Sequence, residues 1–480
     1  MLDIIGIGVG PFNLSLAALL TKTDVTAKFF EQKAEFNWHK GMILPSTTLQ
    51  VPFMADLVTL IDPTSPYSFL NYLHTQHRLL KFYFLEEFKI YRKEYNRYCQ
   101  WVAEQLDSLN FDAAVIDVAF DDTNDGFVVT VCEQGTQNTY HAKNLVIGTG
   151  TQAMLPLSLQ DIAKQAPNRC MHTAHFADNF DLDSLKPNSG KVEEGLPKVL
   201  VLGSGQSSAE VYRTLFDQQF DGDDSTNDYP KFQLDWMTRS AGFFPMEYSP
   251  LGLEHFSPAY TDYFYHLDSA TKPQVTAKQD LLYKGMGFET IRDIYHRLYE
   301  RSITNQDLYS TLMSNCEVIE ATLTTLTTLT TLTTLTTLTT LTTLTTMLEA
   351  PEPTDTIKLV VKQREQNQDF TAEYDCVIAG TGYRYGLPEC LNTILPTIAH
   401  DEFEQPIIDR DYALKYALTH QKDIATDGKI FVQNQEVHTH GVGTPDLGLG
   451  AYRAGCIVNQ LTGEQTYDTD ALKVFQKFGA

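Results

Sequence analysis

Residues Gly6-Ile7-Gly8-Val9-Gly10-Pro11 join two apolar stretches of different character near the start of the chain. The stretch before them, Leu2-Asp3-Ile4-Ile5, is short and β-prone, whereas Asn13 to Leu20 is typical of a helix. A second β-prone stretch, Thr26 to Phe30, ends at Glu31. A strand, a glycine-rich turn, a helix and another strand form the beginning of a βαβ unit. The sequence therefore predicts an α/β fold with a dinucleotide-binding domain.

Each residue of this first turn has an expected role. Gly6 would permit the turn, Gly8 would let a pyrophosphate approach the backbone, and Gly10 would let the helix pack closely on the strand. The pattern ends in Pro11, so that it reads GxGxGP rather than GxGxxG. Glu31, about 20 residues beyond the glycines, would accept hydrogen bonds from the ribose hydroxyls. We expect all five residues to bind the first cofactor.

A second turn of the same kind follows the strand Val199-Leu200-Val201-Leu202. It reads Gly203-Ser204-Gly205-Gln206-Ser207-Ser208-Ala209-Glu210, and a helix is expected through Phe216. Two such turns in one chain predict a flavin domain with a nicotinamide domain inserted into it, because a flavin can relay electrons from a nicotinamide. A 2′-phosphate on the nicotinamide nucleotide would require an Arg near this turn. Arg239 is the candidate and Arg213 is the alternative.

Two strand-to-glycine junctions, Leu145 to Gly150 and Val377 to Tyr383, suit a chain that leaves the first domain and later re-enters it. We expect a flavin domain of residues 1–190 and 371–480, which also carries substrate-site elements, and a nicotinamide domain of residues 191–370. The predicted fold class is thus α/β, with two Rossmann-like domains and a small, mainly helical substrate region.

Two further stretches call for separate interpretations. Residues 322–346 repeat Thr-Leu-Thr with a period of three, which matches neither a helix nor a strand. We interpret this tract as an expanded, exposed loop between the strands Cys316–Ala321 and Ile357–Val361. The tyrosine-rich stretch Phe82 to Tyr98, in which Lys, Arg and Glu recur, is predicted to be an amphipathic covering helix.

The composition narrows the class of protein. Of 480 residues, 42% are hydrophobic and 20% charged, and the net charge is −25. This balance indicates a soluble globular protein and disfavours a nucleic-acid partner, although an acidic field would concentrate a polycationic substrate. No stretch approaches the ~18 apolar residues of a membrane span. Seven scattered cysteines without a CxxC pair favour reduced thiols, a cytoplasmic location and no metal site.

Seven motifs identify a family. They are Gly6-Ile7-Gly8-Val9-Gly10-Pro11-Phe12-Asn13-Leu14, Phe36-Asn37-Trp38-His39-Lys40-Gly41-Met42, Leu49-Gln50-Val51-Pro52-Phe53-Met54-Ala55-Asp56-Leu57-Val58, Pro66-Tyr67-Ser68-Phe69-Leu70-Asn71-Tyr72-Leu73, Gly203 to Glu210, Ala379-Gly380-Thr381-Gly382-Tyr383 and His438-Thr439-His440-Gly441. On these motifs the chain resembles the FAD- and NADPH-dependent N-hydroxylating monooxygenases of hydroxamate siderophore biosynthesis, the lysine N6-/ornithine N5-hydroxylase group. The resemblance runs from Asp3 to about Gln460, apart from the Thr/Leu tract.

The resemblance implies FAD and NADPH as cofactors. It places Trp38, His39, Met42 and Gln50 along the flavin, and Ser207, Ser208 and Arg239 on NADPH. With the second turn and the glycine and aspartate loops near the C-terminus, the further cofactor-binding residues are Gly203, Gly205, Gln206, Gly382 and Asp446.

The reaction follows from the same resemblance. NADPH would reduce FAD, O2 would add at flavin C4a, and the distal oxygen of the hydroperoxide would pass to a primary amine. The protein would position the reactants and exclude water, without a nucleophile of its own. The amine must react in its neutral form, so desolvation has to lower its pKa from about 10.4.

Substrate choice rests on one departure from the family. Amino-acid hydroxylases of this family anchor the substrate α-carboxylate with a Lys in the segment that matches Val51 to Val58, where this chain has Ala55. A second position, an Asn in those enzymes, falls at Leu253. Without both partners a buried carboxylate would be unpaired and costly. The chain is thus most similar to the diamine branch, which hydroxylates putrescine or cadaverine. The carboxylates expected near the distal ammonium are Asp56, Glu254 and Asp446.

Other functions stay open at this point. The enzyme could hydroxylate lysine or ornithine that is held differently, or it could be an NADPH oxidase that releases peroxide. A non-catalytic, flavin-binding assembly partner is the alternative outside enzymes. The resemblance also implies a homo-oligomer, either a dimer or a tetramer.

Overall fold

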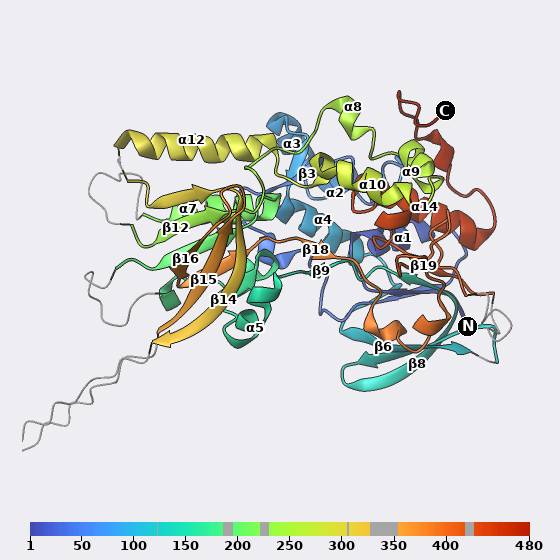
Figure 1. The fold of residues 1–480 in the computed structure, drawn as a ribbon. Coiled ribbons are helices and arrows are strands. Elements are labelled where there is room, and N and C mark those ends of the chain that lie inside the picture. Colours follow the sequence, from blue (N-terminus) through green and yellow to red (C-terminus); the bar gives the residue numbers. More distant parts are fainter. Residues whose placement is uncertain (122, 186–194, 221–229, 305–306, 327–353, 418–426) are drawn as a thin grey trace, which may run out of the picture. The chain divides into compact units, whose positions relative to one another are not determined.

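The computed structural model describes residues 1–121, 123–185, 195–220, 230–304, 307–326, 354–417 and 427–480. The chain divides into two compact units (Figure 1). Met1–Gln152, Met246–Gly285 and Tyr383–Ala480 form the first unit, and Ala153–Pro245 with Met286–Gly382 forms the second. The first segment of the first unit therefore ends at Gln152 rather than near residue 190. Residues 246–285, which were expected in the nicotinamide domain, also belong to the first unit. Tyr260, Phe264 and Leu282 from that segment share a buried cluster with Val442, which explains why it belongs there.

The first unit is built on a seven-stranded sheet in the order β5-β2-β1-β8-β7-β6, with β19 also paired to β8. Strand β1 is parallel to β2 and to β8, strand β2 is parallel to β5, and strand β19 is parallel to β8. Strand β7 pairs antiparallel with both β6 and β8. The strands are β1 (Leu2–Ile7), β2 (Ala27–Phe30), β5 (Leu109–Asn110), β6 (Ala113–Asp121), β7 (Gly126–Glu133), β8 (Thr136–Ile147) and β19 (Ile430–Val432).

Helix α1 (Pro11–Leu20) is apolar on nearly every side and is almost entirely buried. Such a helix needs cover all round, because no face of it gains from contact with water. Helix α14 (Gly448–Thr462) provides part of this cover and lies beside α1 in Figure 1. A Cβ on Gly450 of α14 would lie 2.8 Å from the ring of Phe12, so the two helices approach closely at that point.

The second unit contains a five-stranded parallel sheet in the order β10-β17-β11-β12-β13. Its central strand β11 is almost continuously apolar and buried, as expected for a parallel strand that is covered on both faces. Helices α7 (Gln206–Gln218) and α12 (Phe288–Thr304) pack against each other in this unit. The strands are β10 (Cys170–His172), β11 (Lys198–Leu202), β12 (Gln233–Met237), β13 (Ser310–Met313) and β17 (Cys376–Ala379).

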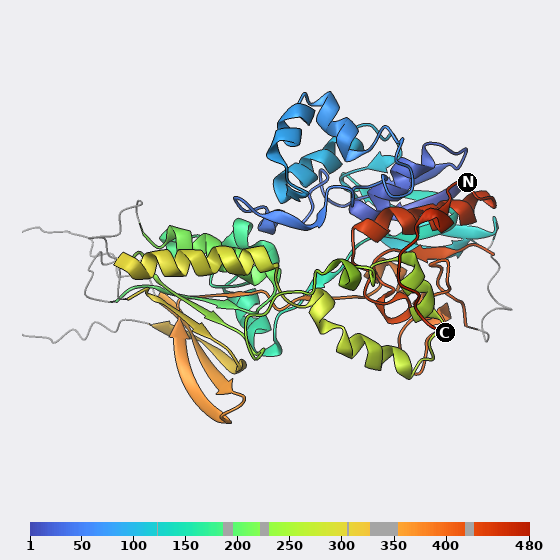
Figure 2. The same ribbon diagram turned by 90° about the horizontal axis from the view of Figure 1, so that it is seen from above.

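A separate antiparallel sheet, drawn in yellow-orange and orange in Figure 2, also belongs to the second unit. It consists of β14 (Cys316–Leu326), β15 (Thr354–Gln363) and β16 (Gln368–Tyr374). The predicted pairing of the strands that flank the Thr/Leu tract is confirmed, since β14 pairs with β15. The tract was expected to be a loop from residue 322, but Thr322–Leu326 continues β14 because its backbone still finds partners in β15. The rest of the tract lies outside the described residues.

Short elements complete the first unit. The prediction of a single covering helix over Phe82 to Tyr98 is wrong. Helix α3 ends at Leu85, and a short strand separates it from helix α4. These elements are η1 (Lys40–Met42), β3 (Thr48–Pro52), α2 (Phe69–Thr75), α3 (Leu79–Leu85), β4 (Lys89–Tyr91), α4 (Arg92–Ala103), α8 (Pro250–Leu253), α9 (Pro258–Tyr265), α10 (Thr271–Lys278), α11 (Asp280–Tyr283) and α13 (Val437–His440). Among the helices of the described residues, none is long and apolar enough to cross a bilayer. All seven cysteines are free thiols.

Candidate active site

The first glycine turn lies between β1 and α1, but its glycines act differently from the expectation. Gly6 lies inside β1 rather than in the turn, and a Cβ there would come within 2.0 Å of the Phe29 ring. Gly8 makes the turn, with φ of +84°, and a Cβ on it would lie 2.9 Å from the carbonyl oxygen of Gly148. Gly10 is the N-cap of α1. Gly6 is therefore required by strand packing, and Gly8 by both conformation and close approach.

A buried amide that the sequence analysis did not single out holds this turn open. The side-chain nitrogen of Asn13 donates to the carbonyl oxygens of Ile7 (3.3 Å) and Gly8 (2.7 Å), and Gln433 donates to its Oδ1 at 2.7 Å. Asn13 is fully buried. A polar residue in the apolar run Phe12 to Leu20 was the signal for such a role, because a buried amide needs partners.

The end of β1 offers backbone donors to an anion. Gly10 caps α1 without a side-chain hydrogen bond, and Pro11 begins the helix. An N-terminus of this kind favours a phosphate through its N–H groups and its dipole. The carboxylate of Glu31 lies beside it and accepts from the backbone nitrogens of Val9 (2.8 Å) and Lys33 (3.1 Å). These residues fit a dinucleotide whose pyrophosphate lies on α1 and whose ribose lies near Glu31.

The second turn repeats this geometry in the second unit. Gly203 has φ of +107°, and a Cβ on it would lie 2.3 Å from the carbonyl oxygen of Gly380. Gly205 is the N-cap of α7, again without a side-chain hydrogen bond. The indole nitrogen of Trp236 donates to the carbonyl oxygen of Gly203 at 2.7 Å, a contact with no signal in the sequence. The structure corrects the role expected for Ser208: its hydroxyl is fully buried and donates to the Leu202 carbonyl oxygen at 2.9 Å.

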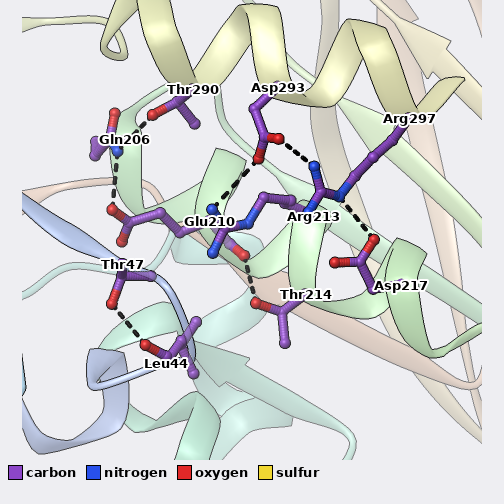
Figure 3. Close-up of polar contacts among 10 residues, drawn as sticks. All are labelled: Leu44, Thr47, Gln206, Glu210, Arg213, Thr214, Asp217, Thr290, Asp293 and Arg297. Carbon is purple, nitrogen blue, oxygen red and sulfur yellow. Dashed lines mark hydrogen bonds and ion pairs between the residues drawn. The ribbon is translucent and has the colours of Figure 1, made fainter. Parts of the chain in front are cut away.

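Two other residues expected near the second nucleotide face α12 instead (Figure 3). Gln206 donates to Glu210 and Thr290 and accepts from the backbone nitrogen of Gly287, so that its amide is fully used within the protein. Arg213, the alternative phosphate-binding cation, pairs with Asp293 at 3.4 Å. The structure thus assigns both side chains to the packing of α7 on α12.

The remaining predicted residues of the second site are exposed to different degrees. Ser207 is half-buried in the first turn of α7, and Arg239 is exposed just after β12. β12 neighbours β11 in the sheet, so Arg239 lies beyond the carboxyl end of the strand next to the glycine turn. This edge of a parallel sheet is where ligands bind. Gly382, with φ of +87°, lies in the loop after β17 and accepts from the Met154 nitrogen.

The loop after β2 carries the residues expected along the flavin. The ring of Trp38 lies 4.7 Å from that of His39 and 5.3 Å from that of Tyr95. His39 adopts φ of +49°. Gln50 is half-buried on β3. Met42 is only 1% exposed, so its side chain belongs to the protein core and offers no surface to a ligand, contrary to the expectation.

Two of the three candidate carboxylates for an ammonium have structural roles. Asp56 is 4% exposed and accepts four hydrogen bonds, from the nitrogens of Val58, Thr59 and Phe69 and from the Thr59 hydroxyl. Glu254 accepts from the nitrogens of Phe475 (3.0 Å) and Gln476 (2.8 Å), and these bonds lower its pKa. The first carboxylate fixes a turn, and the second holds the C-terminal segment. Leu253 is 39% exposed on α8.

Asp446 is the candidate carboxylate that lies near Ala55. A Cβ on Gly448 would lie 2.8 Å from the Oδ1 of Asp446 and 3.7 Å from the Cβ of Ala55, so both side chains adjoin the same point at the start of α14. The Leu449 nitrogen donates a long hydrogen bond to the carboxylate of Asp446, at 3.3 Å, and the backbone of Gly448 also donates to it. Burial raises the pKa of Asp446 to about 6. Burial and the nearby Asp446 charge also raise the pKa of Tyr248 to about 12.

A buried ion pair supports the loop that carries Asp446. Arg453 on α14 pairs with Glu436 at 2.6 Å, and both side chains are at most 2% exposed. The guanidinium also donates to the carbonyl oxygen of Thr444 at 2.7 Å and lies 4.6 Å from the centre of the Phe12 ring. Arg453 therefore ties the loop before α14 to the first turn of α1.

Two glycine turns, each followed by a helix whose N-terminus is open to an anion, define an α/β protein with two dinucleotide sites, as in flavin-dependent oxidoreductases. The family model for L-lysine 6-monooxygenase/L-ornithine 5-monooxygenase matches residues 1–385, and the chain belongs to this family. This confirms the predicted family and its α/β fold class.

Similar proteins include enzymes that act on diamines. The rhizobactin siderophore biosynthesis protein RhbE of Rhizobium meliloti is 39% identical, over 99% of this chain and 95% of its own. The putrescine N-hydroxylase of Shewanella oneidensis is 38% identical, over 99% of this chain and 84% of its own. The crystal structure of FAD-bound DfoA, the cadaverine monooxygenase of the desferrioxamine pathway in Erwinia amylovora, is 34% identical with a TM-score of 0.83, over 100% and 99% of the chains.

The ion pair gives a stability prediction. We expect Arg453→Met to lower the free energy of unfolding by about 3–5 kcal/mol, because it leaves the buried Glu436 without its cation. The double variant Arg453→Met with Glu436→Gln should recover a large part of that loss, since it removes both charges. Urea unfolding monitored by circular dichroism measures both. Equal losses in the single and the double variant would contradict an ion pair and point to packing alone.

Proposed function

We propose that this protein is an FAD- and NADPH-dependent N-monooxygenase that hydroxylates one amine of a small aliphatic diamine, putrescine or cadaverine, for hydroxamate siderophore biosynthesis. Membership of the lysine/ornithine monooxygenase family supports the reaction type, and the similarity to diamine hydroxylases supports the substrate class. The two open helix N-termini suit the two cofactors.

The pairing of Ala55 with Asp446 carries the substrate proposal. An α-carboxylate bound beside Ala55 would face the carboxylate of Asp446, and Arg453, the cation that acts on Asp446, is already paired with Glu436. Two anions in a buried setting repel each other and lack compensation. An ammonium group at the same place would pair with Asp446 instead. A molecule with an amine at each end and no carboxylate fits this polarity.

In this proposal the protein positions the substrate and sets the charge of its two amines, and no side chain attacks it. Asp446, when ionised, holds the distal ammonium and keeps it charged, because an adjacent anion favours the protonated amine. The reacting amine, several methylenes away, gives its proton to solvent on binding, because the exclusion of water disfavours its charged form. Bound FAD, reduced by NADPH, would activate O2 and supply the oxygen atom. Asn13 and Gln433 keep the first turn rigid, and positioning of this kind accounts for much of such catalysis.

The second turn and Arg239 support NADPH as the reductant. Arg239 is an exposed cation at the binding edge of the sheet, whereas Arg213 is engaged with Asp293. Ser207, half-buried in the first turn of α7, is the hydroxyl that remains for a phosphate contact. We also propose a homo-oligomer in the cytoplasm. The seven free thiols suit a reducing compartment.

A substrate assay tests the proposal directly. Purified enzyme with FAD should form hydroxylamine in step with NADPH oxidation for putrescine or cadaverine, and much less for ornithine or lysine. Hydroxylated amino acids without hydroxylated diamines would overturn the substrate class. A cation would then have to bind the α-carboxylate, and Lys89, whose Nζ lies 5.6 Å from the centre of the Tyr248 ring, would be the first to replace. NADPH loss without hydroxylamine would indicate an oxidase. No flavin and no turnover would indicate an assembly partner.

Ala55→Lys tests the local polarity. The new ammonium should pair with Asp446 and displace the substrate ammonium, so we expect kcat/KM for the diamine to fall by about 100-fold, on the order of 3 kcal/mol. Ala55→Met is the matched control, because it adds similar bulk without charge. Equal losses in the two variants would show that size, not charge, matters at this position.

Asp446 also predicts a pH dependence. Below about pH 6 its carboxyl is protonated and cannot pair with an ammonium, so KM for the diamine should fall as the pH rises from 5 to 7. Asp446→Asn should raise KM at pH 8 and remove this dependence. Glu254→Gln, the control, should keep the wild-type pH profile; an unchanged profile in Asp446→Asn would contradict the assignment.

The same substitution should also change stability. Because the folded-state pKa of Asp446 lies above its ordinary value, ionisation of its carboxyl lowers the free energy of unfolding, and unliganded Asp446→Asn should be more stable than wild type above pH 6.

Arg239 predicts cofactor preference. Arg239→Ala should raise KM for NADPH by about 10- to 100-fold and leave KM for NADH nearly unchanged, because only the former carries the 2′-phosphate. Arg213→Ala should lower thermal stability without altering this preference. Stopped-flow measurement of flavin reduction at varied NADPH and NADH concentrations gives the preference between the two nucleotides. A loss shared equally by the two nucleotides would exclude Arg239 from phosphate recognition.

A further inference from the structure

Helix α3 is an apolar helix that is covered on one side only: Phe82 packs against Phe53 and Phe69, and the other side is exposed. It reads Leu79-Leu80-Lys81-Phe82-Tyr83-Phe84-Leu85, and none of its residues is buried. Leu80, Tyr83 and Phe84 are 65%, 70% and 69% exposed, and Phe88 just beyond the helix is 64% exposed. A helix that is hydrophobic all round is normally a buried one, because each apolar side chain left in water forgoes stabilisation.

The exposed area is large for the surface of a monomer. With about 150–250 Å² for an aromatic side chain, the exposed fractions of residues 79–88 correspond to roughly 700 Å². The largest apolar patch on a typical monomer is about 300–600 Å². One partner in a stable protein interface contributes about 800 Å². Helix α3 with Phe88 thus supplies most of one side of an interface.

Charge around α3 selects the partner. Exposed Arg78 and Lys81 lie at the N-terminal end of the helix and exposed Glu86 and Glu87 follow its C-terminal end, so the segment lacks the cluster of cations that anionic membrane surfaces bind. Within the helix, exposed Lys81 lies toward the N-terminal end, while the exposed glutamates lie just beyond the C-terminal end. An antiparallel copy of the same segment would place each lysine opposite the partner's glutamates. The segment is therefore complementary to itself.

We propose that α3 is covered by α3 of a second copy of this chain, in an antiparallel pair about a twofold axis near Tyr83. In such an interface one patch meets itself, and Lys81 of each copy faces Glu86 and Glu87 of the other. Tyr83, Phe84 and Leu80 form its apolar centre. This proposal concerns assembly and does not depend on which amine is the substrate.

The first test measures mass in solution. Wild-type protein loaded with FAD should sediment as a dimer or a higher even oligomer at micromolar concentration. The double variant Tyr83→Glu with Phe84→Glu should have half that mass, with unchanged circular dichroism and flavin content. Leu157→Glu is the matched control, since Leu157 is 87% exposed on α5 (Leu157–Gln165) of the second unit, and it should keep the wild-type mass. A monomeric wild type, or an unchanged mass in the double variant, would overturn the proposal.

Charge reversal tests the register. Lys81→Glu alone, and Glu86→Lys with Glu87→Lys alone, should each weaken association at least 10-fold, because like charges then face each other. Mixing these two variants in equal amounts should restore association as heterodimers, which an indirect effect on folding would not produce. Failure of the mixture to associate would overturn the antiparallel arrangement.

Other occupants of α3 give distinct results. Hydrogen exchange that shows α3 protected in a monomeric wild type would assign the cover to the second unit of the same chain. Binding of wild type, but not of the Tyr83→Glu, Phe84→Glu variant, to vesicles of phosphatidylethanolamine and phosphatidylglycerol would assign it to lipid. Either result would overturn the proposal.

Discussion

The close approach of two backbones, at Gly8 and Gly148, is the constraint on which the first unit depends. With a Cβ on Gly8 only 2.9 Å from the Gly148 carbonyl oxygen, neither the turn nor the sheet edge leaves room for a side chain. Gly148 has the same limit, since its own Cβ would lie 2.3 Å from the Asn13 side chain. The amide of Asn13 fills this space and satisfies the carbonyl oxygens at the end of β1. The N-terminus of α1 is thereby kept open, and β1, β8 and the loop after β19 are held in one register.

The second unit solves the same problem with different atoms. There the hydroxyl of Ser208 occupies the place beside Gly380 and bonds to Leu202, while the Trp236 indole holds the carbonyl oxygen of Gly203. In both units a small polar side chain at the start of a helix secures the preceding strand, and the glycine turn is left to the ligand. A hydroxyl or amide inside a glycine motif therefore need not face the cofactor.

Sequence reasoning succeeded where a pattern has one physical solution. The glycine turns and their strands followed from spacing, because a βαβ unit places a strand, a glycine turn and a helix in that order. The family followed from the resemblance of seven motifs. The pairing of β14 with β15 followed from two apolar stretches. Sequence reasoning failed where the role of a residue depends on partners that are distant in the sequence. The sequence does not distinguish the three carboxylates Asp56, Glu254 and Asp446. In the structure, Asp56 accepts from Phe69, 13 positions away, and Glu254 accepts from Phe475 and Gln476, 221 and 222 positions away. Asp446 instead lies near Ala55. The inclusion of residues 246–285 in the first unit likewise rests on their contact with Val442.

The interleaving of the two units has a consequence for synthesis of the chain. The parallel sheet of the second unit has all its strands once residue 379 has left the ribosome, whereas the first unit still lacks β19 and α14. The inner unit can therefore reach its native state while the outer one is incomplete, although the outer one begins first. Until α14 emerges, the buried face of α1 lacks its α14 cover, and Glu436, once synthesised, has no guanidinium to meet. The N-terminal part of the nascent chain therefore exposes apolar surface for longer than the central part.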